Sequence, residues 1–532
     1  MVALTNGSSP NGVNGVTSNG TSRRSNDAPG GWVIQKFGGT SVGKFADKIA
    51  EEVVSMYLDR NRVAIVCSAR STDVKETGTT NRLMRAATEA MKPDSSEYIG
   101  IIDAMRDDHI QASKEAIRDE NILADLVKEI ESECTKVSRL LSAAQILDEI
   151  SPRTLDNIIG TGEKLSCLYM TALLQDRGLE AEFINLESII TCVGGPGAAP
   201  AIGKEGLGQN FYDSLAVALG NRVKQVQNKI PVITGYFGTV PGSLLTQIGR
   251  GYTDLCAALV AVGLEADELQ IWKEVDGIFT ADPRKVSTAR LIRSITPEEA
   301  AELTYFGSEV IHPFTMEQAI RKRIPIRIKN VMRPEGEGTI VFPDTMSRKG
   351  EETPSAVPRH VRLLSEDALL QHRTKRPTAV TVKRNSMVLN IHSNKKALSH
   401  DFFANIFNIL QRYKLVIDLI STSEVHVSMA LAADVRSHEL RECLRELEVF
   451  GSVEVIKDLA IISLVGKQMK HMVGIAGRMF AALAEFNINI EMISQGASEI
   501  NISCVIKEAD AIRAMNVLHT KLFTYQDALD QL

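Results

Sequence analysis

Residues 36–45 read KFGGTSVGKF, and they separate two kinds of phosphate-binding fold. From Gly38 to Lys44 they fit the G-x-x-x-x-G-K spacing of a Walker A loop, which follows a strand. That motif needs Ser or Thr after the lysine to bind Mg²⁺, but the next residue is Phe45. The other reading uses two glycines at a strand end, whose bare N–H groups face an anion beside Lys36. By itself, an ordinary βα turn with a surface lysine explains the stretch equally well.

Composition excludes several classes of protein. The chain has 532 residues, a formal net charge of −6, 44% hydrophobic and 24% charged residues. These values are typical of a globular protein of about two to four domains, and they argue against nucleic acid as a partner. The longest apolar run, residues 256–264, is far shorter than the ~20 residues of a membrane span, so no membrane association is expected.

The seven cysteines are scattered and form no CxxC pair. This pattern favours a reducing compartment, the cytoplasm, over a disulfide framework or a zinc site, and it assigns no residue as a metal ligand. Residues 1–30 are rich in Asn, Gly and Ser and predict a disordered tail. A transit peptide is the weaker alternative, because Arg23 and Arg24 are the only basic residues there.

Between Trp32 and Phe342, short apolar runs alternate with helical patterns. The expected strands are WVIQKF, RVAIVCSA, IPVITGYFG, ELQIWKEV and IPIRIKNV. Several are apolar at consecutive positions, which is typical of a parallel sheet covered by helices on both faces. The pattern predicts an α/β domain over residues 31–345.

Beyond a polar connector at residues 346–377, the chain repeats itself. Residues 407–421 align with 480–494, and SEVHVS (423–428) then aligns with SEINIS (498–503). Each copy reads as a helix, a turn and alternating strands, which predicts two small α+β units. We expect them at residues 378–455 and 456–532, the first possibly completed by the C-terminal segment.

Three further motifs mark strand ends or helix starts. GRGYTD (249–254) precedes an apolar helix, GEKLS (162–166) is expected to begin another, and WKEVDGIFTADPR (272–284) follows a strand. Capping and turn chemistry explain many of these residues. They do not explain why Arg and acidic residues gather where open α/β sheets bind ligands.

Together, KFGGTSV, GEKLS, GRGYTD and VDGIFTADPR resemble the aspartate kinases of the amino acid kinase family, and the repeat resembles a pair of ACT domains. The resemblance extends from Val33 to the C-terminus; FGSEVIHPFT (306–315) and the CSARSTDVKETGTTN insertion resemble the fungal branch. It implies an amino acid kinase fold, a mainly parallel sheet between helices, followed by two ferredoxin-like ACT domains. The implied reaction converts ATP and L-aspartate into ADP and 4-phospho-L-aspartate, with Mg²⁺ as cofactor.

The resemblance also implies a role for each matching residue. Lys36 would stabilise the transferring phosphoryl group and Asp254 would organise that lysine. The implied phosphate and nucleotide contacts are Lys36, Gly38, Gly39, Thr40, Ser41, Lys273, Glu274, Phe279 and Arg284. The implied aspartate contacts are Ser68, Thr80, Glu163, Arg250 and Thr253, with Glu163 on the ammonium and Arg250 on the α-carboxylate.

Two positions depart from the family pattern. Glu309 stands where bacterial relatives have lysine, so it is given no nucleotide role. Lys273-Glu274 replaces Thr-Asp, which leaves the nucleotide contacts open. A glutamate or acetylglutamate kinase and a catalytically silent amino-acid sensor are the alternatives. A fused homoserine dehydrogenase is not expected, because no G-x-G-x-x-G follows a strand and the chain stops after the second repeat.

Regulation is expected in the repeat. The resemblance implies feedback inhibition by threonine and a place in threonine, methionine and isoleucine synthesis. A homodimer or larger homo-oligomer would cover the sheet edges. The candidate effector contacts are Asn390, Ser393, Asp418, Ser423, Asn487, Ile488 and Gln495. For each one, a satisfied polar residue in a turn is an equally good explanation.

Overall fold

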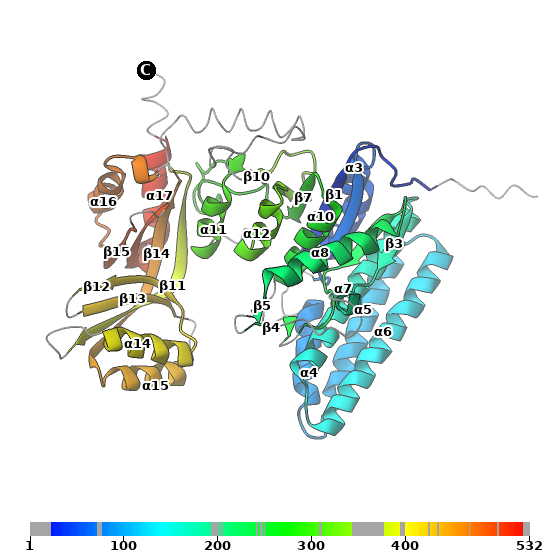
Figure 1. Ribbon diagram of the computed structural model, residues 1–532, viewed down its shortest axis with the longest axis horizontal. Coiled ribbons are helices and arrows are strands. Elements are labelled where there is room, and N and C mark those ends of the chain that lie inside the picture. The colour runs from blue at the N-terminus through cyan, green and yellow to red at the C-terminus, as the bar shows by residue number, and fades with distance from the viewer. Residues whose placement is uncertain are drawn as a thin grey trace, which may run out of the picture.

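A computed structural model describes most of the chain. The described residues are 23–71, 77–192, 202–203, 206–240, 243–244, 248, 251–307, 311–342, 377–393, 400–423, 426–433, 436–467, 469–496 and 500–524. The chain forms an α/β unit that contains β1 to β10 and an antiparallel unit built from β11 to β16. Figure 1 shows α11 and α12 between the rest of the α/β unit and the antiparallel unit. The expected connector lies almost entirely outside the described residues.

An eight-stranded sheet forms the α/β unit. Its strands are β1 (Trp32–Phe37), β2 (Arg62–Cys67), β3 (Ala181–Ile184), β6 (Ile230–Thr234), β7 (Glu268–Lys273), β8 (Ser294–Ile295), β9 (Ile326–Asn330) and β10 (Thr339–Val341). They lie in the order β3-β6-β2-β1-β7-β9-β10-β8, and only the β9–β10 pair is antiparallel. The carboxyl ends of β1, β2, β6 and β7 therefore meet at one edge, with β1 near the centre.

Helices cover both faces of this sheet, as expected. Along β2, Ala64 and Val66 face one apolar core, whereas Val63 and Ile65 face the other. The first core is closed by α8 (Gln209–Lys224), α10 (Tyr252–Leu264), α11 (Pro297–Tyr305) and α12 (Pro313–Arg321). The second is closed by α2 (Ala46–Lys48), η1 (Ile49–Val54), α3 (Ser55–Tyr57), α4 (Thr79–Ala90), α5 (Glu97–Ala116), α6 (Glu120–Leu147) and α7 (Pro152–Asp176). The smaller elements are α1 (Gly39–Lys44), η3 (Ile189–Cys192), β4 (Ile202–Gly203) and β5 (Gly206–Leu207).

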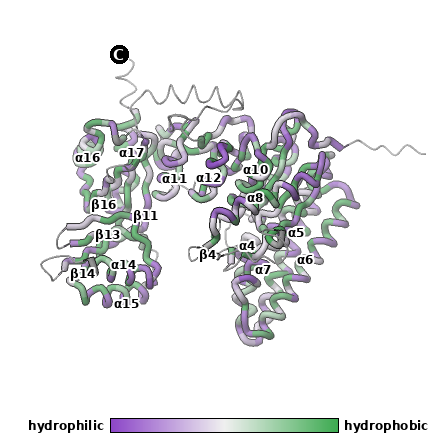
Figure 2. Tube along the Cα trace, in the orientation of Figure 1, coloured by the Kyte–Doolittle hydropathy of each residue, from purple (hydrophilic) through white to green (hydrophobic). Residues whose placement is uncertain are grey.

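The helices α5 and α6 form an outer layer, and both alternate hydrophobic and hydrophilic residues along their length (Figure 2). Apolar residues of both helices join the second core, whereas their other faces meet solvent. None of the helices in the described part of the chain has the length and apolar character that a membrane span needs.

The end of the expected tail is ordered. Asn26 is fully buried, and its side-chain amide donates to Val63 O at 2.9 Å and to Lys229 O at 3.1 Å. Its Oδ1 accepts from Val63 N, so one side chain joins the starts of β2 and β6. Composition placed this residue in the tail because short polar segments carry no signal for such anchoring. Residues 1–22 lie outside the described part.

The C-terminal unit is a six-stranded antiparallel sheet of the ACT type. Its strands are β11 (Ala379–Ser393), β12 (Ile417–Thr422), β13 (His426–Ala432), β14 (Gly451–Val465), β15 (Met492–Ser494) and β16 (Asn501–Lys507), in the order β12-β13-β11-β14-β16-β15. Its helices are α14 (His400–Arg412), α15 (Ser437–Leu447), α16 (Ile475–Glu485) and α17 (Ala511–His519), with the short η5 (Met469–His471), η6 (Glu508–Asp510) and η7 (Thr520–Thr524).

Two long strands run through both repeats. The second half of β11 pairs with β13, whereas its first half, residues 379–383, pairs with residues 461–465 of β14 beside β16. The strand that completes the second repeat thus comes from before the first repeat. This differs from the expectation that the C-terminal segment possibly completes the first repeat. The domain boundaries themselves stay a prediction.

One buried carboxylate joins the two units. Glu299, in the first turn of α11, accepts through Oε2 from the backbone and hydroxyl of Thr296 in a capping box. Its Oε1 accepts from Thr378 Oγ1 at 2.6 Å and from Lys467 N at 2.8 Å. Hydrogen bonds to a buried charge are among the stronger ones, so Glu299 fixes the antiparallel sheet to the start of α11.

Candidate active site

An ion pair lies at the carboxyl edge of the large sheet. Lys36, near the end of β1, places Nζ 2.7 Å from Asp254 Oδ1 in the first turn of α10. Both side chains are largely shielded, with 12% and 18% of their surface exposed. The lysine is thereby held at the carboxyl end of β1, next to the N-terminus of α10, which also favours negative charge.

Glu163 lies beside this pair. It is buried in the middle of α7, and its Oε1 accepts from Thr253 Oγ1 at 2.6 Å. Its Oε2 is buried with no hydrogen-bond partner among the described residues. Burial raises the pKa of Glu163 to about 7, although the neighbouring Thr253, Tyr252 and Lys36 act to lower that pKa. A buried carboxylate oxygen without a partner is costly, so this atom is suited to a donor from a ligand.

The position of Glu163 corrects one expectation. We predicted that GEKLS begins a helix, but α7 begins at Pro152, where Ser151 caps it by accepting from Thr154 N. The prediction was wrong, and Gly160 and Gly162 lie inside the helix. Both instead permit close packing: a Cβ at 160 would lie 2.5 Å from the Tyr236 ring.

Helix capping, the structural alternative for the GRGYTD motif, does not explain the positions of Thr253 and Asp254. The N-cap of α10 is Gly251, and no side chain caps the helix there. Thr253 donates to Glu163 and Asp254 pairs with Lys36, so both are turned to the site. Arg250 lies outside the described residues.

Sequence reasoning missed Gly235, which directly follows β6. A Cβ at this position would lie 2.3 Å from Thr253 Cγ2 and 2.8 Å from Glu163 Oε2. Only glycine lets the strand end approach both side chains. The available signal was a glycine inside the expected strand IPVITGYFG, which in the structure already ends at Thr234.

The glycine turn after β1 is tied to the next strand. Gly38 is the N-cap of α1, and a Cβ on Gly39 would lie 2.0 Å from the Ala69 carbonyl oxygen. Ser41 is buried and its hydroxyl donates to Glu274 Oε1 at 2.6 Å. That hydroxyl is therefore engaged with the end of β7, which leaves backbone groups as the donors of this turn, beside the half-buried Thr40.

The remaining expected contacts lie on several elements, and their interactions with described residues do not join them into one group. Ser68 follows β2 and donates its N–H to Phe37 O, and Thr80 lies in the first turn of α4. Lys273 ends β7. Phe279 pairs with Leu291 across a β-bridge, and the exposed Arg284 forms an ion pair with Asp282. Glu309 lies outside the described residues.

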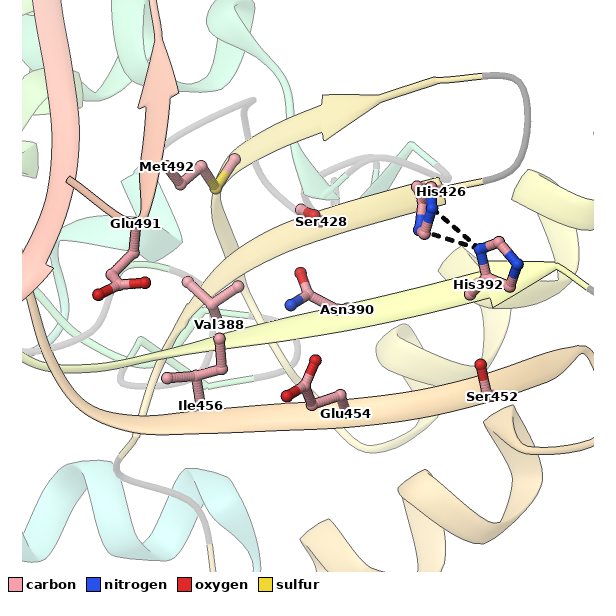
Figure 3. Close-up of a pocket in the computed structure, with 10 residues that line it drawn as sticks. All are labelled: Val388, Asn390, His392, His426, Ser428, Ser452, Glu454, Ile456, Glu491 and Met492. Carbon is pink, nitrogen blue, oxygen red and sulfur yellow. Dashed lines mark hydrogen bonds between the residues drawn. The ribbon is translucent and has the colours of Figure 1, made fainter.

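The expected effector residues do not form one group. Asn390 lines a pocket of about 270 Å³ together with Val388, His392, His426, Ser428, Ser452, Glu454, Ile456, Glu491 and Met492 (Figure 3). The imidazoles of His392 and His426 lie across neighbouring strands, with ring nitrogens 3.0 Å apart. Glu491 and Met492 reach the pocket from the second repeat, so both halves of the sheet contribute to it.

Asp418 lies elsewhere, on β12. Its side chain is 1% exposed, and Oδ1 is 2.6 Å from Lys383 Nζ. The Lys383 ammonium also lies 5.3 Å from the centre of the Tyr305 ring, at the end of α11. Asp418 thus already has a cationic partner, and this partner contacts the catalytic unit.

The other expected effector contacts are local. Ser423 exchanges hydrogen bonds with His426 across a turn, and Asn487 has a positive φ of 53° after α16. Ile488 is buried in the second repeat, Gln495 is exposed and Ser393 is buried at the end of β11. Ser423 and Asn487 thus lie at turns, and Ile488 is part of an apolar core.

Comparison with known proteins defines the class. Residues 31–330 match the amino acid kinase family, and residues 462–522 match an ACT domain. The aspartokinase of Candida albicans is 55% identical over 503 residues, covering 93% of this chain and 90% of its own length. That of Schizosaccharomyces pombe is 54% identical over 497 residues, covering 93% and 94%.

Solved structures agree. Escherichia coli aspartokinase III with aspartate and ADP superposes with a TM-score of 0.68 at 28% identity, covering 92% of this chain and 99% of that one. The same enzyme with lysine and aspartate gives a TM-score of 0.70 over the same shares. The chain belongs to the amino acid kinase family and, within it, to the aspartokinases. It is therefore an enzyme rather than a catalytically silent sensor.

The close packing of Gly235 against Thr253 and Glu163 allows the site geometry to be tested by substitution. In Gly235→Ala the new methyl group overlaps Thr253 and Glu163, so aspartate kinase turnover should fall at least about a hundredfold, because ångström-scale displacement of positioned groups has that effect. Gly208→Ala is the control, since a Cβ there meets nothing within 4 Å. Near-normal turnover of Gly235→Ala in a steady-state assay would contradict this geometry.

Proposed function

We propose that Lys36, held by Asp254, stabilises the γ-phosphoryl group of ATP during its transfer to the side-chain carboxylate of L-aspartate, which yields 4-phospho-L-aspartate. The observation that carries this proposal is the 2.7 Å ion pair beside the buried Glu163. A carboxylate with a pKa near 4 is already ionised at neutral pH and needs no general base. Catalysis then consists of positioning two anions and neutralising charge, which suits a shielded ammonium.

We assign aspartate recognition to the neighbouring side chains. Glu163 Oε2, which is buried without a partner in the described part of the site, accepts from the substrate ammonium. Thr253 orients Glu163 through its 2.6 Å hydrogen bond. Arg250, Thr80 and Ser68 complete the proposed set on the α-carboxylate.

The nucleotide contacts are proposed at the neighbouring strand ends. Backbone groups of Gly38, Gly39, Thr40 and Ser41 would face the phosphates, and Lys273, Glu274, Phe279 and Arg284 would flank the rest of ATP. Aspartokinase III of Escherichia coli binds ADP, which supports a nucleotide at this edge. In the described residues, no three or more His, Cys, Asp or Glu side chains cluster as metal ligands. We propose that Mg²⁺ is carried by the phosphates of ATP, where it would neutralise charge.

The raised pKa of Glu163 predicts a pH dependence. The carboxyl is largely protonated below its pKa of about 7, and only the carboxylate attracts an ammonium. The kcat/KM for aspartate should therefore fall about tenfold for each pH unit below 7 and level off above it. Glu163→Gln should give a lower profile that is flat between pH 6 and 8. A flat wild-type profile, or a break retained in Glu163→Gln, would refute the assignment.

We further propose that threonine inhibits the enzyme through the ACT-type sheet, and that the enzyme acts in threonine, methionine and isoleucine synthesis as a cytoplasmic homodimer or larger homo-oligomer. Escherichia coli aspartokinase III binds lysine in addition to aspartate, which supports an amino-acid effector. The six described free cysteines, all buried, are compatible with a reducing compartment.

The contact of the effector ammonium is proposed to be Asp418. Its Oδ2 is buried with no hydrogen-bond partner in the described part of the chain, while Oδ1 faces Lys383. An incoming ammonium therefore competes with Lys383. Displaced Lys383 would leave the Tyr305 ring, so effector binding would be felt at the end of α11.

The proposed competition between the effector ammonium and Lys383 for Asp418 can be tested by substitution. In Asp418→Asn, the threonine concentration for half inhibition should rise at least about tenfold, because a charged contact of roughly 1.5–3 kcal/mol is lost. Glu446→Ala removes an exposed ion pair with Arg412 in the same repeat and is the matched control. Inhibition by lysine but not threonine, or an equal effect of both substitutions, would reject the proposal.

A further inference from the structure

The segment that carries Phe279 and Arg284 is an arm that leaves the catalytic unit. We define the nucleotide arm as residues 278–292, which fold back on themselves after β7. Its two sides are joined by hydrogen bonds from Thr280 N to Arg290 O at 2.9 Å and from Ile292 N to Ile278 O at 2.8 Å. Between these sides the arm turns at Asp282, whose carbonyl oxygen accepts from the backbone N–H groups of Lys285 and Val286.

Two residues that flank the tip of the arm are buried in the ACT-type unit. Ala281 and Val286 are 4% and 1% exposed, and they belong to the apolar core made by α16, α17 and the second half of β14. Thr280 O also accepts from Val380 N of β11 at 2.8 Å. The backbone between the two expected nucleotide contacts is thus supported by the ACT-type unit, whereas Thr339 of β10 holds the two ends of the arm, at Ile278 and Ile292.

One histidine spans the arm. His519, the last residue of α17, is fully buried; its Nε2 lies 2.8 Å from Thr280 Oγ1 and its Nδ1 3.0 Å from Thr288 Oγ1. The ring stacks on Phe523 with 4.9 Å between centroids and 6° between planes. Both ring nitrogens are therefore used, one on each side of the arm, and the ring cannot turn without losing them.

The hydrogen bonds leave little freedom in the arm. Thr280 Oγ1 accepts from Arg290 N, so its own proton is available to Nε2, and Nδ1–H can donate to Thr288. Burial and the nearby Arg290 lower the pKa of His519, which keeps the ring neutral as this arrangement requires. Arg290 itself donates to Phe523 O at 3.0 Å, which adds a second link to the same helix end.

We propose that His519 is a positioning residue for the nucleotide: by bridging Thr280 and Thr288 it fixes the backbone that presents Phe279 and Arg284, so that nucleotide affinity depends on the end of α17. The inference rests on the proposed nucleotide role of those two residues. On this inference α17 supports the ATP site, although the helix itself has no proposed contact with a substrate. Changes in the ACT-type unit would then act on ATP binding directly through the arm.

The test measures ADP affinity of the full-length protein by calorimetry. His519→Leu removes both hydrogen bonds of the bridge and Thr288→Val removes one of them. Each should weaken ADP binding about tenfold or more, with the KM for aspartate changed less than about twofold. His519→Gln, which keeps a donor and an acceptor, should recover part of the affinity. Thr288→Val replaces only one hydroxyl group with a methyl group. If His519→Leu does not fold, the ADP affinity of Thr288→Val therefore tests the role of the bridge.

Two controls separate the possible failures. Asn501→Ala removes a hydrogen bond to Glu302 of α11, in the same interface but away from the arm, and should leave ADP affinity unchanged. If it weakens ADP binding as much as Thr288→Val, or if Thr288→Val has no effect, the inference is overturned. Arg284→Ala tests the nucleotide assignment itself: unchanged ADP affinity in that variant refutes the proposed site, whereas a loss there without a loss in Thr288→Val refutes only the role of His519.

Discussion

The ion pair between Lys36 and Asp254 is the contact on which the arrangement of the site depends. It joins the end of a central strand to the first turn of α10, and Thr253 in the same turn orients Glu163. A shielded lysine needs a counter-charge, because an unpaired ammonium is costly away from water. The ion pair therefore holds the lysine in place, and it also fixes the first turn of α10, from which Thr253 reaches Glu163.

The catalytic and regulatory units are not independent bodies in this fold. Glu299 joins α11 to the antiparallel sheet, Lys383 pairs with Asp418 while touching Tyr305, and Ala281 and Val286 lie inside the ACT-type core. Packed interfaces of this kind shift between discrete arrangements rather than deforming gradually. An effector that favours one arrangement by differential contact therefore has short physical routes to both α11 and the nucleotide arm.

Much of this could be predicted from the sequence, because consecutive apolar residues and glycines at strand ends are local signals. The five expected strands of the catalytic unit and the KFGG turn were of this kind. The start of α7 could not be predicted correctly, since Gly160 and Gly162 serve packing with distant residues. The pairing of residues 379–383 with β14, the Lys383–Asp418 ion pair and the burial of Asn26 depend on contacts far apart in the chain, for which a single sequence carries no pattern.

The central claim is that Lys36 acts on the transferring phosphoryl group and not on binding. The most direct measurement is single-turnover formation of the acyl phosphate from aspartate, trapped with hydroxylamine, in wild type and Lys36→Ala at saturating ATP. The account predicts a chemical step slower by roughly a thousandfold or more, with ADP affinity changed by less than about tenfold. A near-normal chemical step in Lys36→Ala, or acyl phosphate formed from glutamate but not from aspartate, would contradict it.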